Sequence, residues 1–121
     1  ISNLVNSYLT KNKRKITQIL NENNFSSDDC IQIIRFLLIK SKKLLELSND
    51  FQENKNIDLT IDSAKPPIFW KEKDITKQQV FKWKPEKIRK MIYKLSEIEL
   101  GVKKNFDNSV NLLTSFLLEQ S

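Results

Sequence analysis

The chain has 121 residues and a mass of 14.3 kDa, which fits one domain with one hydrophobic core and is too small for two. Its net charge of +6 favours acidic partners such as nucleic acid, although compositional drift toward lysine accounts for the same excess equally well. Histidine is absent, and glycine and cysteine each occur once. Histidine-based acid–base catalysis, glycine-rich phosphate loops and cysteine-rich zinc sites are therefore excluded.

The cellular setting is expected to be the cytoplasm. No apolar stretch approaches the roughly 20 residues that a membrane-spanning helix needs, and the first residues do not form a signal peptide. Cys30 is the only cysteine, so it cannot form an internal disulfide, and nothing indicates an oxidising compartment. Because the chain begins with Ile1 and not with methionine, we interpret residues 1–121 as one domain from a longer protein.

Helical periodicity runs through the whole chain. Apolar residues recur mainly at spacings of three and four, and only Gly101 and three prolines interrupt the pattern. This predicts an all-α fold, a compact bundle of about five main helices. In chain order, a short helix is expected over residues 3–9 and a second one over residues 12–23, with Ile16 facing the core.

The third helix is expected to be the longest. Ser26 supplies an N-cap, and Asp28 and Asp29 supply an acidic first turn that matches the positive end of a helix. From that start the helix is expected to run to about Phe51. Its first part, residues 31–39, is apolar nearly all round, so we expect this part at the centre of the domain.

A loop and a short helix follow. Residues 54–56 have the strongest loop pattern, and Asp58 can cap a short helix that stops at Lys65, because a residue before proline is pushed out of helical geometry. The next helix is expected to end near Trp83.

Two helices are expected to complete the chain. Pro85 marks the start of the first, since its missing N–H costs nothing in a first turn. The inward stripe of this helix is expected at Ile88, Met91, Ile92, Leu95, Ile98 and Val102. Residues 105–107 are predicted to form a turn, and the last helix to start at Asp107 or Asn108. Its buried residues are expected to be Val110, Leu113, Phe116 and Leu117.

Acidic side chains are the remaining candidates for catalysis. Asp28 and Asp29 fit a helix start, and Glu97 and Glu99 fit a helix surface, so we expect no catalytic residue, no metal and no cofactor. Glu99 also lies beside the inward stripe and precedes Lys103 by one helical turn. We interpret the two as an ion pair that fixes the helix register, with a contact to another protein as the alternative.

Aromatic residues stand next to lysines at two places in the chain. The first place contains Phe69, Trp70, Lys71 and Lys73, and the second contains Lys103, Lys104 and Phe106. An aromatic face can stack on a base while neighbouring lysines hold phosphates, a combination suited to single-stranded or end recognition. Aromatic residues in a helical domain usually belong to the core, so burial is the alternative at both places.

The residue order from Ala64 onward is the most specific feature of the chain. The segment AKPPIFWKEKDITKQQVFKW holds a double proline, an aliphatic residue, two aromatic residues and a lysine, at Pro66, Pro67, Ile68, Phe69, Trp70 and Lys71. A helix ending in tryptophan and a proline-started helix follow, with the closing pattern Glu97, Glu99, Leu100 and Lys103. This order resembles the C-terminal collar domain of the δ subunit of bacterial DNA polymerase III, the clamp-loader subunit that opens the sliding clamp.

The resemblance covers essentially the whole chain and is densest over residues 65–110. Lys84 stands where that family usually has serine, and Gly101 stands where alanine is usual. Losing a hydroxyl N-cap typically costs about 1 kcal/mol, so we expect water or another side chain to satisfy this helix end. Neither departure changes the order of the elements.

The resemblance implies a non-catalytic oligomerisation domain. Such a domain packs beside the collar domains of other clamp-loader subunits, and those subunits bind and hydrolyse ATP. Two further domains precede it, and the element that binds the sliding clamp lies in that N-terminal part. In that family the collar faces the end of the primer–template DNA. The resemblance makes Phe106, in the turn before the last helix, the first candidate for contact with DNA and Phe69 the second.

Two other function classes stay open. An unrelated small basic helical module that binds nucleic acid fits the charge and the same candidate residues: Phe106, Phe69, Lys103, Lys104, Lys71 and Lys73. An enzyme fits the composition least well. The first two classes differ in behaviour, because a binding module is expected to hold DNA alone with a steep salt dependence, whereas a collar needs its partner subunits.

Overall fold

The computed structural model describes residues 1–119, and these residues form seven α-helices and two short 3₁₀ helices with no strand. In chain order the elements are α1 (Ser2–Leu9), α2 (Lys13–Glu22), α3 (Ser27–Asn54), α4 (Ile57–Asp62), η1 (Trp70–Glu72), α5 (Lys73–Lys82), α6 (Pro85–Lys104), η2 (Phe106–Asn108) and α7 (Ser109–Glu119). Among them, α2, α3, α5, α6 and α7 have 10 or more residues. The prediction of an all-α bundle is confirmed.

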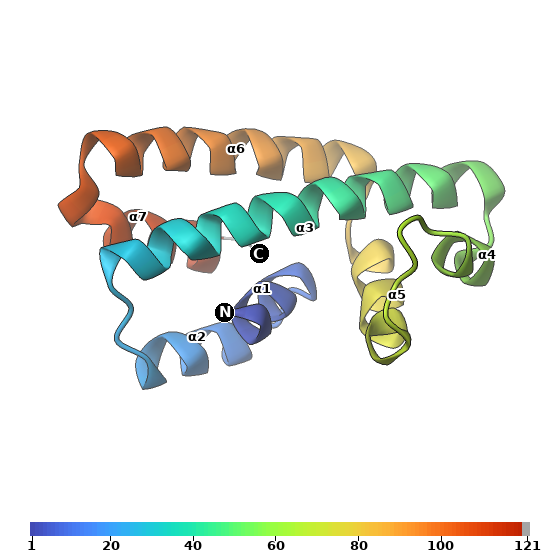
Figure 1. The fold of residues 1–121 in the computed structure, drawn as a ribbon, viewed down its shortest axis with the longest axis horizontal. Helices are drawn as coiled ribbons and strands as arrows, with labels where there is room; N and C mark the ends of the chain where they lie inside the picture. Colours follow the sequence, from blue (N-terminus) through green and yellow to red (C-terminus); the bar gives the residue numbers. More distant parts are fainter. Residues whose placement is uncertain (120–121) are drawn as a thin grey trace.

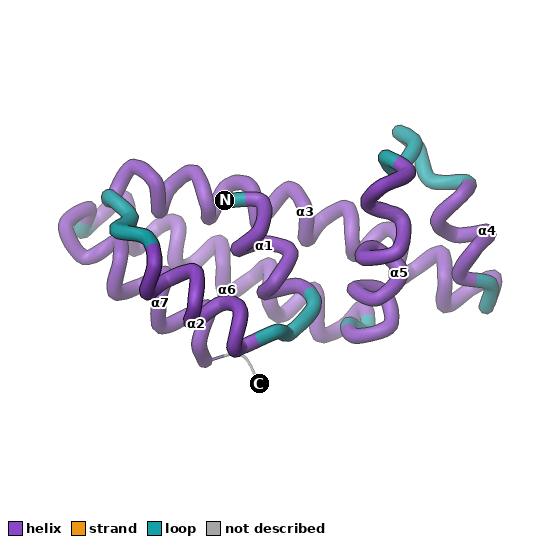
Figure 2. The backbone as a smooth tube through the Cα atoms, turned by 90° about the horizontal axis from the view of Figure 1, so that it is seen from below, coloured by secondary structure: helices purple, strands orange, loops and turns teal. Residues whose placement is uncertain are grey.

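The two longest helices, α3 and α6, form the spine of the molecule. They run side by side in opposite directions along its long axis and make the most extensive helix–helix contact (Figure 1). Figure 2, which looks at the molecule from below, shows α1, α2 and α7 over one half of this pair and α4 and α5 at the other end. The bundle therefore has two layers, with the spine as one of them.

The start of α3 is determined by its own first residues. Ser26 Oγ accepts a hydrogen bond from the Asp29 N–H at 3.1 Å, and Asp29 Oδ2 accepts one from the Ser26 N–H at 2.9 Å. This reciprocal pair satisfies two N–H groups that a helix start leaves without partners. The predicted N-cap is confirmed, and α3 extends past the expected end at Phe51 to Asn54.

Two helix starts differ from expectation. Asn56 caps α4, because its Oδ1 accepts a hydrogen bond from the Leu59 N–H at 3.1 Å, so the prediction of Asp58 as the cap is wrong. Asn54 explains the earlier start, because its Oδ1 accepts a hydrogen bond from the Asn56 N–H at 2.8 Å. This bond closes a turn just before α4, so the helix begins before Asp58. At the start of α6, Lys84 is the N-cap residue, and no side chain makes a capping hydrogen bond there. The serine hydroxyl that the related family usually has at this position is therefore not replaced by another side chain.

A buried aromatic cluster joins α1, α7 and the junction between α5 and α6. The Tyr8 ring centroid lies 5.9 Å from that of Trp83 and 5.2 Å from that of Phe116. The Trp83 indole N–H donates to the Leu9 carbonyl at 2.8 Å, and the Ser48 hydroxyl donates to the Trp83 carbonyl at 3.1 Å. Burial also raises the pKa of the Tyr8 hydroxyl. These contacts link segments that are far apart in sequence and hold the second layer against α3.

Ile39, which lies off the inward stripe of α3, is 70 % exposed, so the apolar segment 31–39 is not buried throughout. Two predictions about individual side chains are wrong. Val110 is exposed, because the first turn of α7 lies at the end of the bundle (Figure 1). Glu99 and Lys103 form no ion pair with each other; both line a small hollow of about 40 Å³ together with Arg35.

Candidate functional site

The structure places the two groups of aromatic residues and lysines in opposite halves of the bundle. Phe106 lies in η2, in the turn between α6 and α7, whereas Phe69 and Trp70 lie where the chain enters η1 and α5. Figure 1 shows the α6–α7 turn at one end of the long axis and the start of α5 in the other half of the molecule, and Figure 2 shows the same separation from a second direction. The residues predicted to contact DNA therefore do not form one surface.

The turn between α6 and α7 carries the first group. Phe106 is 43 % exposed, and Lys103 and Lys104 are exposed on the last turn of α6, where cations suit the negative end of the helix. The Ser109 hydroxyl donates to the Phe106 carbonyl and closes the turn into α7. This end of the bundle thus offers a partly exposed aromatic ring on a turn that directly follows two cations, an arrangement suited to a nucleotide base and its phosphates.

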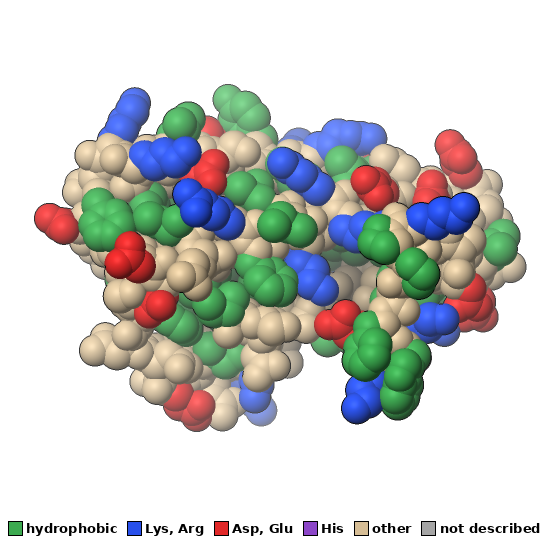
Figure 3. All heavy atoms as spheres, viewed as in Figure 1, with side chains coloured by type: hydrophobic (Ala, Val, Ile, Leu, Met, Phe, Trp, Pro, Cys, Tyr) green, Lys and Arg blue, Asp and Glu red, His purple; other side chains and the backbone are tan. Residues whose placement is uncertain are grey.

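The second group is more exposed. Phe69 and Trp70 are 56 % and 70 % exposed, and their ring centroids lie 5.9 Å apart. The Lys71 ammonium lies 5.3 Å from the Trp70 ring centroid, within the range of a cation–π contact. Figure 3 shows hydrophobic side chains projecting from the surface in this region, at the lower right. Phe69, Trp70 and Lys71 therefore form one exposed cluster.

Lys73 has a different environment. Its ammonium lies 3.0 Å from the Asp62 carboxylate, and the Lys77 ammonium lies 2.7 Å from the carboxylate of Asp58. These ion pairs join α5 to α4, and the hydrogen bond to Asp58 raises the pKa of Lys77. Because Lys73 already has a carboxylate partner within the fold, Lys71 is the stronger candidate for contact with a phosphate.

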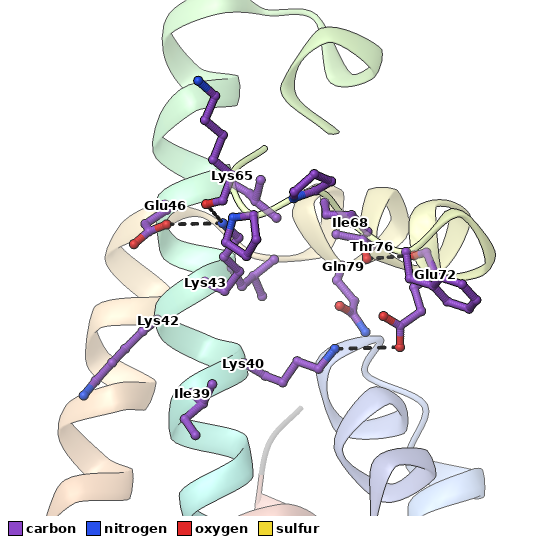
Figure 4. Close-up of a pocket in the computed structure, with 15 residues that line it drawn as sticks. Ile39, Lys40, Lys42, Lys43, Glu46, Lys65, Ile68, Glu72, Thr76 and Gln79 are labelled. Carbon is purple, nitrogen blue, oxygen red and sulfur yellow. Dashed lines mark hydrogen bonds and ion pairs between the residues drawn. The ribbon is translucent and has the colours of Figure 1, made fainter. Parts of the chain in front are cut away.

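A groove that sequence reasoning missed lies between the second half of α3 and residues 65–79 (Figure 4). Its volume is about 680 Å³. The apolar part of its lining comes from Ile39, Leu44, Leu47, Pro66, Pro67, Ile68 and Phe69. The available sequence signal was the run of lysines that follows the apolar half of α3, but such a run on a helix usually marks only a solvated face.

Charged side chains cross the groove and line its walls. The Lys40 ammonium extends across it toward Glu72, with 4.0 Å between nitrogen and oxygen (Figure 4). Lys43 donates to the Lys65 carbonyl at 2.7 Å, and its ammonium also lies 3.6 Å from the Glu46 carboxylate. The bond from Lys43 holds the loop before α5 against α3, so the two walls of the groove are joined.

Within residues 1–119, no group of three or more His, Cys, Asp or Glu side chains is placed to hold a metal ion. In the same part of the chain, no helix is both long enough and apolar enough to cross a membrane. Cys30 is buried, and burial together with the charge of Asp29 raises the pKa of its thiol. A raised pKa keeps this thiol protonated and weakly nucleophilic near neutral pH.

Comparison of the chain with protein-family models, with curated proteins and with solved structures finds no match in any of the three. The link to a clamp loader therefore rests on the residue order described above and stays a prediction.

Proposed function

We propose that this chain is the C-terminal collar domain of a clamp-loader δ subunit, a non-catalytic module through which the subunit assembles with its partners. The observation that supports this most is the order of residue types from Pro66 to Lys103. In the structure this stretch becomes the loop before α5, α5 itself and nearly all of α6. One continuous region of the fold thus carries the resemblance.

In this proposal the domain acts in the cytoplasm, beside the collar domains of other clamp-loader subunits, and supports the loading of the sliding clamp onto primed DNA during replication. ATP hydrolysis belongs to the partner subunits, and the sliding clamp is contacted by domains outside this chain. The end of the bundle with Phe106, Lys103 and Lys104 faces the primer–template DNA.

Exposed apolar side chains on the spine support a protein partner. Ile39 on α3 and Tyr93 and Leu100 on α6 are large hydrophobic residues that the fold leaves exposed. Leu112 on α7 is only partly buried. Apolar surface that a small domain leaves in contact with water commonly marks an interface. We therefore assign the exposed side of α3 and α6 to contact with neighbouring collars.

Assembly tests this proposal. Gel filtration of the chain with purified collar domains of the ATP-binding clamp-loader subunits from the same source should give a complex that elutes before any single component. Leu100→Asp should weaken the complex, whereas Asn21→Asp, which adds the same charge at an exposed position of α2, should not. Separate elution of well-folded components at micromolar concentrations would contradict the proposal.

A second candidate is a small module that binds nucleic acid by itself. The exposed cluster of Phe69, Trp70 and Lys71 and the net charge of +6 favour it. Fluorescence anisotropy of a labelled single-stranded DNA, titrated with the isolated chain at several salt concentrations, separates the two candidates. Saturable, salt-sensitive binding that is lost in Trp70→Ala supports the second candidate, and binding that requires the partner subunits supports the first.

A further inference from the structure

The groove between α3 and residues 65–79 has an apolar interior that is open to solvent. Leu44 and Leu47 are buried at its base, Ile68 is half-buried, and Ile39 and Phe69 are exposed. A volume of about 680 Å³ lies within the range of specific ligand sites. Covering the apolar side chains that still touch water would stabilise a complex at this site.

Positive charge surrounds this apolar interior. Four lysines and two glutamates line the groove, so cations are in excess. The ammonium groups of Lys42 and Lys65 form no hydrogen bond or ion pair with any of the described residues, and both side chains are exposed. Figure 4 shows both side chains at the edges of the groove, pointing away from its interior and into solvent. These two cations are thus available to the carboxylates of a ligand.

We propose that the groove binds an amphipathic, acidic peptide segment of a partner protein. The apolar residues of the segment enter the groove over Leu44 and Leu47, and its carboxylates pair with Lys42 and Lys65. Recognition of this kind places one face of a helix in a hydrophobic groove, with anchor residues at i, i+3 or i+4, and i+7. The proposal does not depend on the clamp-loader assignment, because it rests on the shape and charge of the groove alone.

The lining favours a peptide over a nucleic acid. Bases bind by stacking on aromatic faces, but Phe69 is the one aromatic residue among the described lining residues, and the other apolar residues there are aliphatic. Aliphatic walls between lysines instead match a segment that alternates apolar and acidic faces.

The ion pair between Lys40 and Glu72 crosses the groove and is easily replaced. Its nitrogen and oxygen are 4.0 Å apart, and both side chains are partly exposed. Ion pairs of this kind contribute little to stability. A carboxylate of the peptide can therefore take the place of Glu72 beside Lys40 without disturbing the fold.

Two fluorescein-labelled peptides test the proposal. Each has about 15 residues, enough for about four helical turns, with leucine at the anchor positions. One peptide carries glutamate on its polar face and the other carries glutamine. Fluorescence anisotropy with the intact chain should show saturable binding of the glutamate peptide. The glutamine peptide should bind at least about tenfold more weakly.

Charge reversal at the two unpaired lysines locates the site. The double variant Lys42→Glu/Lys65→Glu should bind the glutamate peptide at least about tenfold more weakly than the unaltered chain. The control Lys13→Glu/Lys90→Glu makes the same change in net charge at exposed positions outside the groove, and it should bind as the unaltered chain does. Far-UV circular dichroism of both variants should match that of the unaltered chain, because none of the four side chains has a partner in the fold.

Three results would overturn the proposal. The first is the absence of saturable binding by the glutamate peptide. The second is an equal loss of affinity in both double variants, which would mean that net charge alone attracts the peptide. The third is binding of a labelled oligothymidine that is lost in Lys42→Glu/Lys65→Glu while the glutamate peptide does not bind, which would assign the groove to nucleic acid.

Discussion

The two tryptophans of the chain have opposite environments, although each stands next to a lysine in sequence. Trp83 is 2 % exposed, donates its indole N–H to the Leu9 carbonyl at 2.8 Å, and has the Lys11 ammonium 4.5 Å from its ring centroid. Trp70 is 70 % exposed, and its ring meets Phe69 and Lys71. One indole is part of the interior, and the other is available to a partner.

The difference shows what a buried tryptophan requires. Its large apolar surface favours burial, but its N–H must find an acceptor there, and the Leu9 carbonyl at the end of α1 supplies one for Trp83. Trp70 begins η1, three residues after a double proline, and its ring stays at the surface. The Trp83 region therefore stabilises the fold, whereas the Trp70 region is free to bind.

Replacing Trp83 should have the largest effect on stability. Trp83→Ala should lower the free energy of unfolding by about 3–5 kcal/mol, because it removes a buried ring from the contact between three segments. Trp83→Phe keeps most of the ring but leaves the Leu9 carbonyl without its donor, so it should cost about 1–3 kcal/mol. Urea denaturation measures both as a lower midpoint at an unchanged slope. A loss below about 1 kcal/mol in the alanine variant would contradict the role given to Trp83.

The exposure of Phe106 lies between that of Trp83 and that of Trp70. Because it is 43 % exposed, Phe106→Ala should lower the free energy of unfolding by only about 1.5 kcal/mol. Urea denaturation of the isolated chain again provides the measurement. A loss of about 3–5 kcal/mol would place Phe106 in the core and remove support for a contact with DNA at this turn.

The start of α3 shows what a purely local contact contributes. The Ser26 backbone N–H, and then its hydroxyl, lower the pKa of the Asp29 carboxyl in the folded state. The stabilisation is therefore present above the unfolded-state pKa of about 4 and is lost as the pH falls through the lower folded-state pKa. Asp29→Asn should be less stable than the unaltered chain at neutral pH, and the difference should shrink in acid. Urea midpoints measured across this pH range test the sign; a gap that widens in acid would refute it.

Trp70→Ala should have the smallest effect on stability. The side chain buries little surface, so the free energy of unfolding should change by no more than about 0.5 kcal/mol. The matched comparison with Trp83→Ala, under the same urea conditions, isolates the effect of the environment from that of the residue type. Destabilisation above about 1.5 kcal/mol would mean that Trp70 packs against the fold in solution.

Local contacts explain what could be predicted from the sequence. Ser26 and Asp29 lie within one helical turn, so their pattern predicted the start of α3, and Pro85 predicted the start of α6 in the same way. The inward stripe of α6 was also predicted, since Ile88 and Leu95 follow from helical spacing alone. The cluster of Phe69, Trp70 and Lys71 was predicted as a candidate for contact with DNA, but the sequence alone favoured burial of its aromatic residues in the core.

The tertiary structure decided which of these residues meet. Ile39 ends the segment 31–39 of α3, which is apolar nearly all round, and the arrangement of the neighbouring helices leaves it exposed. The groove depends on α4 turning the chain back, so that residues 65–79 lie against α3 and Lys43 reaches the Lys65 carbonyl. The spacing of apolar residues indicates which face of one helix is apolar, but it does not indicate how many neighbouring helices cover that face. Helix positions and caps are therefore properties of the sequence, whereas exposure, the separation of the two aromatic groups and the groove arise from long-range packing.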